Sequence, residues 1–460
     1  MGHLLARIGR ARLLVVAGAG VALVAAVGVA IGVMGDGGDD PVEQPATPAA
    51  TPTAAPSATA RPTATPEASA TPIAHAGILD GVAMTDAEWA ARKDLLPLAV
   101  MVDNTTGAYP HAGLDRADLV YEAFVEGGIT RLMAVYWRQE AEKVLPVRSA
   151  RTPFVIWTSE LAAMFGHAGG ASTDNDANAL GQIVEWGVKD LNAFSDVSGN
   201  YYFRDSDRSG PYDLATSTGY LRQAAAELGF AGPPSTASWL FRTPGTPLPK
   251  GKPAEGIAVD FSGRMYSWQY IQWRWDPASH RYLRFQFGGP HLDAISNAQL
   301  AFATVVVMRA PTEVVDGAGH LLYEQLGSGP ATVFTGGQAY EGTWKKEKRE
   351  DRTRFYTAAG EEIVFERGPV FVELISTQSA FSFTAAAGDL PEMPEYEPPP
   401  PGSDPAHEDI EPTPSPVPTA AATPTVPPAP TSTPTPAPSP TATPTSPPTA
   451  TPTLPVIIGE

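Results

Sequence analysis

Two long segments rich in proline, threonine and alanine limit how much of this chain can fold. They cover residues 41–75 and 396–460 of a 460-residue chain. Proline removes backbone donors and fixes φ, and neither segment has enough apolar side chains for a core. We therefore expect a disordered, extended stalk over residues 35–76, a disordered tail over residues 391–460, and folded structure only between them.

An apolar run without a single charge, Leu13–Met34, precedes the stalk. At about 1.5 Å per helical residue it spans roughly 33 Å, enough to cross a hydrocarbon core of about 30 Å. Three arginines lie before it within residues 1–12, and such an excess keeps that side in the cytoplasm. The sequence thus predicts a cytoplasmic segment, a transmembrane signal-anchor over residues 13–34 that contacts the lipid bilayer, and an extracytoplasmic remainder in the cell membrane. A cleavable signal peptide is the alternative.

Charge and composition exclude several classes of function. The net charge is −19, partly because ten acidic and no basic residues follow Arg367. The middle of the chain is closer to neutral and has no basic stripe, so no nucleic-acid partner is expected. The absence of cysteine excludes disulfides, thiolate metal sites and a cysteine nucleophile. No phosphate-binding glycine motif occurs, and no cofactor is expected.

Residues 77–232 alternate between strand and helix signals. Leu98–Asp103 is a continuous apolar strand, whereas Asp115–Glu126 carries apolar residues at helical spacing and predicts a helix. This alternation is typical of a layered α/β domain with a mixed or largely parallel sheet. The further expected elements are strands at Thr130–Trp137, Phe165–His167 and Asp190–Phe194, and helices at Ser149–Met164, Ala177–Trp186 and Gly219–Leu228.

Residues 254–390, which follow a linker at 233–253, change in character. Short segments rich in aromatic and β-branched residues alternate with turn signals and predict a β-rich domain. The mixed-sign charge run Lys345–Arg352 predicts the solvated rim of a hairpin. The expected strands are Tyr266–Trp275, Arg281–Phe287, Ala303–Met308, Ala331–Phe334, Thr353–Tyr356, Ile363–Phe365 and Val370–Ile375.

Charged and polar side chains are predicted to gather at one edge of the first domain's sheet. Ligands of α/β sheets collect at the carboxyl ends of strands, where Asp103, Asn104 and His167 are expected. Glu122 and Glu126, four residues apart, would share one face of the predicted helix. With Asn104, the candidate ligand-binding residues are Arg131, Arg148, Arg151 and Arg204, since guanidinium groups bind anions in bidentate fashion.

Two other interpretations of these residues stay open. Asp103, Glu126 and His167 are candidates for acid–base catalysis. Alternatively, the carboxylates and arginines neutralise one another in ion pairs that fix the packing of the strands and helices.

A weak calcium-loop pattern follows His167. Its oxygen ligands would be Asp174, Asp176, Asn178 and Glu185. Position six of the loop is Ala179 where glycine is expected, so no metal is predicted. The simpler interpretation is that Thr173 or Asp174 caps the following helix.

Four strings of residues resemble the YerB-like family of bacterial envelope proteins, a family of unknown function. They are PLAVMVDN at 97–104, DLVYEAFVEGGITRLMAVY at 118–136, VLPVRSARTPF at 144–154 and HAGGAS at 167–172. The resemblance covers roughly residues 77–390 and implies a two-part folded region behind an export signal. The chain departs from the family in lacking a lipobox cysteine and in having Pro211-Tyr212-Asp213 where Pro-His-Asn is usual.

These observations predict a membrane-anchored, extracytoplasmic protein that binds an anionic envelope component such as a wall polymer or glycan. A hydrolase or transferase acting on cell-wall material is a second hypothesis, and a scaffolding protein of the envelope is a third.

Overall fold

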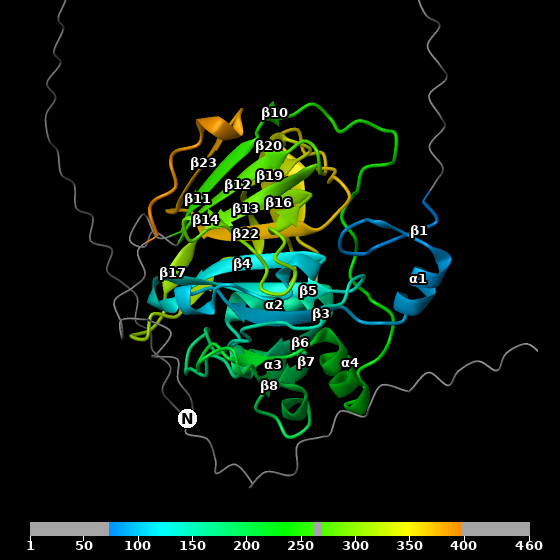
Figure 1. The fold of residues 1–460 in the computed structure, drawn as a ribbon, viewed down its shortest axis with the longest axis vertical. Helices are drawn as coiled ribbons and strands as arrows, with labels where there is room; N and C mark the ends of the chain where they lie inside the picture. Colours follow the sequence, from blue (N-terminus) through cyan, green and yellow to red (C-terminus); the bar gives the residue numbers. More distant parts are fainter. Residues whose placement is uncertain (1–72, 262–268, 397–460) are drawn as a thin grey trace, which may run out of the picture. The chain divides into compact units, whose positions relative to one another are not determined.

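The computed structural model describes residues 73–261 and 269–396, and a mixed sheet of eleven strands runs through them (Figure 1). The predicted signal-anchor and nearly all of the stalk and tail lie outside these residues. No helix within the described ranges combines the length and apolar character needed to span a bilayer.

The large sheet takes strands from both halves of the chain. The first half contributes β4 (Leu119–Val125), β5 (Ile129–Tyr136), β3 (Leu98–Asp103), β6 (Met164–His167) and β7 (Lys189–Asn192), in that spatial order. The second half contributes β10 (Lys252–Pro253), β20 (Gln338–Lys346), β19 (Gly327–Thr335), β16 (Thr304–Ala310) and β22 (Val370–Ser376), with β21 (Arg354–Thr357) beside β20. The halves meet where β22 pairs with β4 in parallel, with Glu373 opposite Glu122.

A six-stranded sheet and four short helices complete the main layers. The sheet contains β14 (Gly289–Pro290), β13 (Arg281–Gln286), β12 (Tyr270–Asp276), β11 (Gly256–Asp260), β23 (Ala380–Thr384) and β15 (Ala301–Phe302). The helices are α1 (Asp86–Arg92), α2 (Thr152–Leu161), α3 (Ala179–Glu185) and α4 (Thr218–Glu227). The remaining strands form three pairs: β1 (His75–Ala76) with β2 (Ala83–Met84), β8 (Phe203–Arg204) with β9 (Leu214–Ala215), and β17 (Thr312–Val314) with β18 (Leu321–Tyr323).

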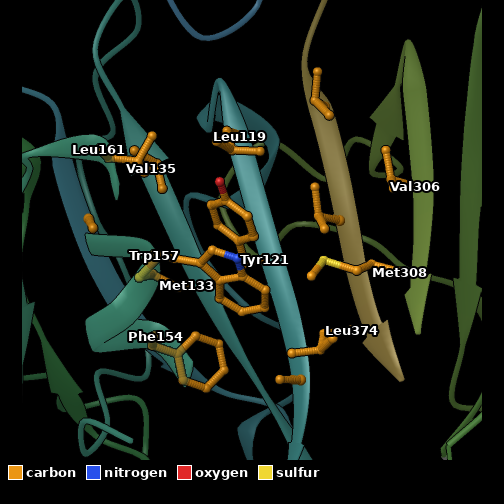
Figure 2. Packing of buried hydrophobic residues seen from close by; sticks show 14 of the residues in the cluster. Leu119, Tyr121, Met133, Val135, Phe154, Trp157, Leu161, Val306, Met308 and Leu374 are labelled. Carbon is orange, nitrogen blue, oxygen red and sulfur yellow. The ribbon is translucent and has the colours of Figure 1, made fainter. Parts of the chain in front are cut away.

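Hydrophobic cores cover both faces of the large sheet. Successive strand residues point to opposite faces, so Met101 joins one core and Val100 the other. On the first face α2 packs against β4, where the rings of Tyr121 and Trp157 stack with centroids 4.3 Å apart (Figure 2). The core of the second face includes Trp273 of the six-stranded sheet. Strands that are covered on both faces have continuous apolar sequences, as β3 has.

The prediction of a helix over Asp115–Glu126 is wrong. Residues Leu119–Val125 form strand β4, and Gly127 and Gly128 turn the chain back into β5 with positive φ angles of 72° and 75°. A strand buried on both faces carries apolar residues at every spacing, and so also at the spacing of a helix. Glu122 and Glu126 consequently do not share a helix face.

Most other predicted elements of the first half are confirmed. The helices at 149–164, 177–186 and 219–228 correspond to α2, α3 and α4, and the predicted strands to β3, β5, β6 and β7. In the second half the predicted strands correspond to β12, β13, β16, β19, β21 and β22. Ile363–Phe365 is not a strand: the structure gives it one isolated bridge, between Phe365 and Phe241.

The charge run Lys345–Arg352 is only partly a solvated rim. Lys346 lies two residues beyond the buried Trp344, and so on the same face of β20. Its ammonium group lies 2.7 Å from Glu160 Oε2, and Arg352 Nη1 lies 2.7 Å from Glu160 Oε1. Thr353 donates to Glu160 as well. These contacts join the β20–β21 hairpin to α2.

Candidate functional site

The carboxyl end of β3 lies at the edge of the sheet where the sequence predicts a site. Strands β3, β6 and β7 run parallel, so their carboxyl ends meet there. The hairpin of β4 and β5 turns at the same edge, and Asp103 pairs with Arg131 of β5. The segment after the bridge Val102–Val147 then brings Arg148 and Arg151 alongside.

Asp103 is fully buried and its carboxylate is held on both oxygens. Arg148 Nε donates to Oδ2 at 2.5 Å, and the backbone N–H of Thr105 donates to Oδ1 at 2.7 Å. Burial alone would raise the pKa of Asp103, but the charges of Arg148 and Arg131 outweigh it and lower that pKa. Asp103 is therefore an ionised carboxylate near neutral pH.

Glu126 is the second carboxylate of this edge. Arg151 donates to its Oε1 through Nη2 and through Nε at 2.7 Å, and Arg131 Nη2 lies 3.5 Å from the same oxygen. Burial opposes ionisation, yet the Arg151 and Arg131 charges lower the pKa of Glu126 to about 2. We call Asp103, Glu126, Arg131, Arg148 and Arg151 the arginine edge. It contains three guanidinium groups and two carboxylates.

Three buried polar atoms at the end of β3 have no hydrogen-bond partner among the described residues. They are Asn104 Oδ1, Thr105 Oγ1 and Arg148 Nη2. Asn104 is nonetheless fixed in place, because its Nδ2 donates to Glu122 Oε1 at 2.9 Å and to Thr130 Oγ1 at 2.7 Å. Buried polar groups are normally satisfied, so this concentration at one strand end is unusual.

Tyr212 lies against Arg148 of the arginine edge, and the sequence analysis did not predict it. The Arg148 guanidinium lies over its ring, 5.3 Å from the centroid, and the Arg148 side chain is 12% exposed. The only signal in the sequence was the departure from Pro-His-Asn at this position.

His167 and Arg204 bind other partners. His167 lies at the end of β6 with Nδ1 2.7 Å from Gly169 O and Nε2 2.8 Å from Asp190 Oδ1. Arg204 lies in β8, is 55% exposed, and pairs with Asp213 at 2.7 Å. Of the predicted site residues, the structure thus brings together Asp103, Asn104, Glu126 and the arginines 131, 148 and 151.

A buried polar chain connects this edge to the six-stranded sheet, and the sequence did not predict it. Arg284 Nη2 lies 2.5 Å from Glu122 Oε2, and Arg284 Nη1 lies 2.6 Å from His291 Nδ1. His291 Nε2 is 2.8 Å from His111 Nδ1, whose Nε2 is 2.7 Å from the carbonyl oxygen of Asp103. Burial lowers the pKa of His111 to about 4, so the ring is neutral at neutral pH.

Glu373 lies beside this chain. Trp273 Nε1 donates to Glu373 Oε1 at 2.6 Å, and Glu122 faces it from the adjacent strand. Burial and the charge of Glu122 raise the pKa of Glu373 to about 8. The group is therefore largely a neutral acid at neutral pH.

The residues of the calcium-loop pattern lie just before helix α3 and within it. The side chain of Asn178 accepts from Gly181 N at 3.0 Å and caps α3, so the cap is Asn178 rather than Thr173 or Asp174. Glu185 is the last residue of that helix. Within the described part of the chain, no group of three or more His, Cys, Asp or Glu side chains is arranged to hold a metal ion.

Comparisons with known proteins match two successive parts of the chain. Family models described as "Protein of unknown function (DUF3048)", N-terminal and C-terminal domains, match residues 83–231 and 257–372. A relative named "Putative lipoprotein YerB", from Bacillus subtilis (strain 168), is 29% identical over 253 residues, which are 54% of this chain and 73% of the relative. The crystal structure of the YerB protein from Bacillus subtilis is similar in fold, with a TM-score of 0.57 and 24% identity over 67% of this chain and 99% of that chain. The chain therefore belongs to the DUF3048 family and contains both of its parts.

Proposed function

We propose that this protein is a membrane-anchored, extracytoplasmic envelope protein that binds an anionic ligand at the arginine edge. Its relative is named as a lipoprotein, a class attached to membranes through lipid on a cysteine. This chain has no cysteine, and the apolar run 13–34 would provide the attachment instead.

The unpartnered polar atoms at the end of β3 carry this proposal. Leaving a buried donor or acceptor unsatisfied costs about 1–3 kcal/mol. An oxyanion would accept from Arg148 Nη2 and from the Thr105 hydroxyl, and a neighbouring ligand hydroxyl would donate to Asn104 Oδ1. The guanidinium group of Arg148 favours the same ligand, a phosphate or carboxylate next to hydroxyl groups, as found in anionic wall polymers and glycans.

Tyr212 determines how such a ligand would reach the site. Its ring lies over the Arg148 guanidinium, so the ligand either displaces the ring or stacks on it. Arginine suits this role because its planar group stacks on an aromatic face while donating in its own plane.

The same geometry favours ligand binding, rather than acid–base catalysis, as the role of the arginine edge. Asp103 and Glu126 are held ionised by arginines, which makes both poor proton donors near neutral pH. Both ring nitrogens of His167 are already engaged.

Binding of wall polymer by variants tests the proposal. The full-length protein in detergent is sedimented with cell-wall fragments, before and after the phosphate-bearing polymer is stripped from them. We expect Arg148→Gln to weaken retention by about tenfold or more, because it removes the charge that faces the ligand. Thr105→Val is expected to weaken retention without lowering stability, because it removes a hydroxyl that has no partner among the described residues.

Arg354→Gln is the matched control, since Arg354 lies in β21, away from the end of β3, and pairs with Glu362. Retention that is unchanged in both Arg148→Gln and Thr105→Val, or that survives removal of the anionic polymer, would contradict the proposal.

A further inference from the structure

A cavity of about 540 Å³ lies apart from the arginine edge, at the junction of the two matched family parts. Its walls come from residues 113–116, from residues 140–143, from the start of α4, and from a turn that contains Asp293 and Ser296. This volume falls within the range of small-molecule sites, about 300–1,000 Å³, and such sites favour domain junctions.

Two carboxyl groups meet in this cavity. Asp293 is held rigidly: Oδ2 accepts from Gly113 N at 2.6 Å, and Oδ1 accepts from Ile295 N at 2.9 Å and Ser296 N at 3.2 Å. Asp115 lines the same cavity, and its carboxyl interacts with that of Asp293. Burial and the charge of Asp293 raise the pKa of Asp115, and the opposing effects of Ser296 and the Arg116 charge do not cancel this rise.

Some charges of the cavity wall are already neutralised. Glu140 pairs with Arg92 and with Arg222, the latter at 2.8 Å. Lys143 Nζ lies 2.6 Å from Asp205 Oδ2. These residues shape the wall but leave little charge for a ligand.

The remaining charges of the wall are predominantly negative. Asp115, Asp293 and Glu142 line the cavity together with Arg116. Within residues 73–261 and 269–396, no ion pair reaches Asp115 or Glu142. With all four groups ionised their sum is −2, so the cavity favours a cationic ligand.

The polar and apolar groups around the carboxyl pair suit a sugar ring. Ser217 begins α4 as its cap, accepting from Tyr220 N at 3.0 Å, and its own hydroxyl hydrogen is left to donate to a ligand. Ile295, a largely exposed side chain, gives the rim an apolar surface. Glu142 and Ser217 thus supply hydrogen-bond partners for the hydroxyl groups of a ligand.

We propose that this cavity binds an amino sugar with a free, protonated amine, which lies between the carboxyl groups of Asp115 and Asp293. The sugar hydroxyls bind Ser217 and Glu142, and the ring packs on Ile295. The site is independent of the arginine edge.

Calorimetric titration of the full-length protein tests this site. Glucosamine is compared with N-acetylglucosamine, which has the same ring but no charged amine. We expect glucosamine to bind about tenfold or more tightly than its acetylated form. Asp115→Asn is expected to weaken glucosamine binding by about tenfold or more. Unlike a structural defect, this substitution should leave stability unchanged or higher, because it relieves repulsion from Asp293.

Asp196→Asn, an exposed residue outside the cavity wall, is the matched control. Glu142→Gln, at an exposed position, provides a second variant that does not depend on the carboxyl pair and should weaken binding less. Equal binding of the two sugars, no binding of glucosamine, or an Asp115→Asn variant with undiminished affinity would each overturn the proposal.

Discussion

Arg284→Met is expected to lower the free energy of unfolding by about 3–5 kcal/mol, because it leaves a buried carboxylate without its cation. Arg284 and Glu122 are both fully buried and lie 2.5 Å apart, and they join the six-stranded sheet to the large one. His291 loses its guanidinium partner as well. Urea denaturation of the full-length protein measures the effect.

Arg204→Met is the matched control for this substitution. Arg204 also pairs with a carboxylate, that of Asp213, but is 55% exposed, and exposed pairs contribute about 0–1 kcal/mol. Combining Arg284→Met with Glu122→Gln is expected to cost less than the two changes added together, because no buried charge is left unpaired. A loss for Arg284→Met no larger than for Arg204→Met would show that the pair is not buried in solution.

Glu373→Gln is expected to stabilise the protein progressively as the pH rises from about 4.5 to 8. The pKa of Glu373 rises from its ordinary 4.5 to about 8 in the fold, so between these values the native state binds more protons than the unfolded state. Stability of the unmodified protein then falls with increasing pH, by about 1.4 kcal/mol per unit. Glutamine cannot ionise and still accepts from Trp273 Nε1.

The difference between variant and parent isolates this effect. His111 and His291 have lowered pKa values and impose the opposite slope at acid pH, but they titrate in both proteins. We expect nearly equal stability near pH 4.5 and a difference of about 4 kcal/mol at pH 8. Glu313→Gln, on the exposed part of β17, controls for the loss of one carboxylate. Parallel stability curves for Glu373→Gln and the parent would show that Glu373 is already ionised in the fold.

Local sequence patterns were sufficient to predict strand β3 and the position of its carboxyl end. An apolar run ending in Asp103-Asn104 indicates a buried strand and its carboxyl end, and both positions are confirmed. The same kind of pattern failed at Leu119–Val125, because burial on both faces removes the alternation that separates a strand from a helix. A clue was present in Glu122, a charged residue inside an apolar run.

The sequence alone could not predict which distant residues bind to the residues at that edge. Arg284, in β13, and His291, just after β14, reach it from about 160 to 180 residues further along the chain. His167 stood at the expected strand end, but its pairing with Asp190 depends on the register of β6 and β7, which periodicity does not reveal. Lys346 and Arg352 were misplaced for the same reason, since their buried partner Glu160 lies on a distant helix.

The parallel pairing of β22 with β4 has a consequence for biosynthesis. Strand β4 ends at Val125, whereas β22 begins at Val370, so the middle of the sheet closes only after nearly all of the described chain has been made. Until then β4 presents a long apolar edge, the kind of surface on which chains aggregate. A fragment that stops short of Val370 would keep that edge permanently open, and dissection of the protein into its two family parts is therefore expected to yield insoluble material.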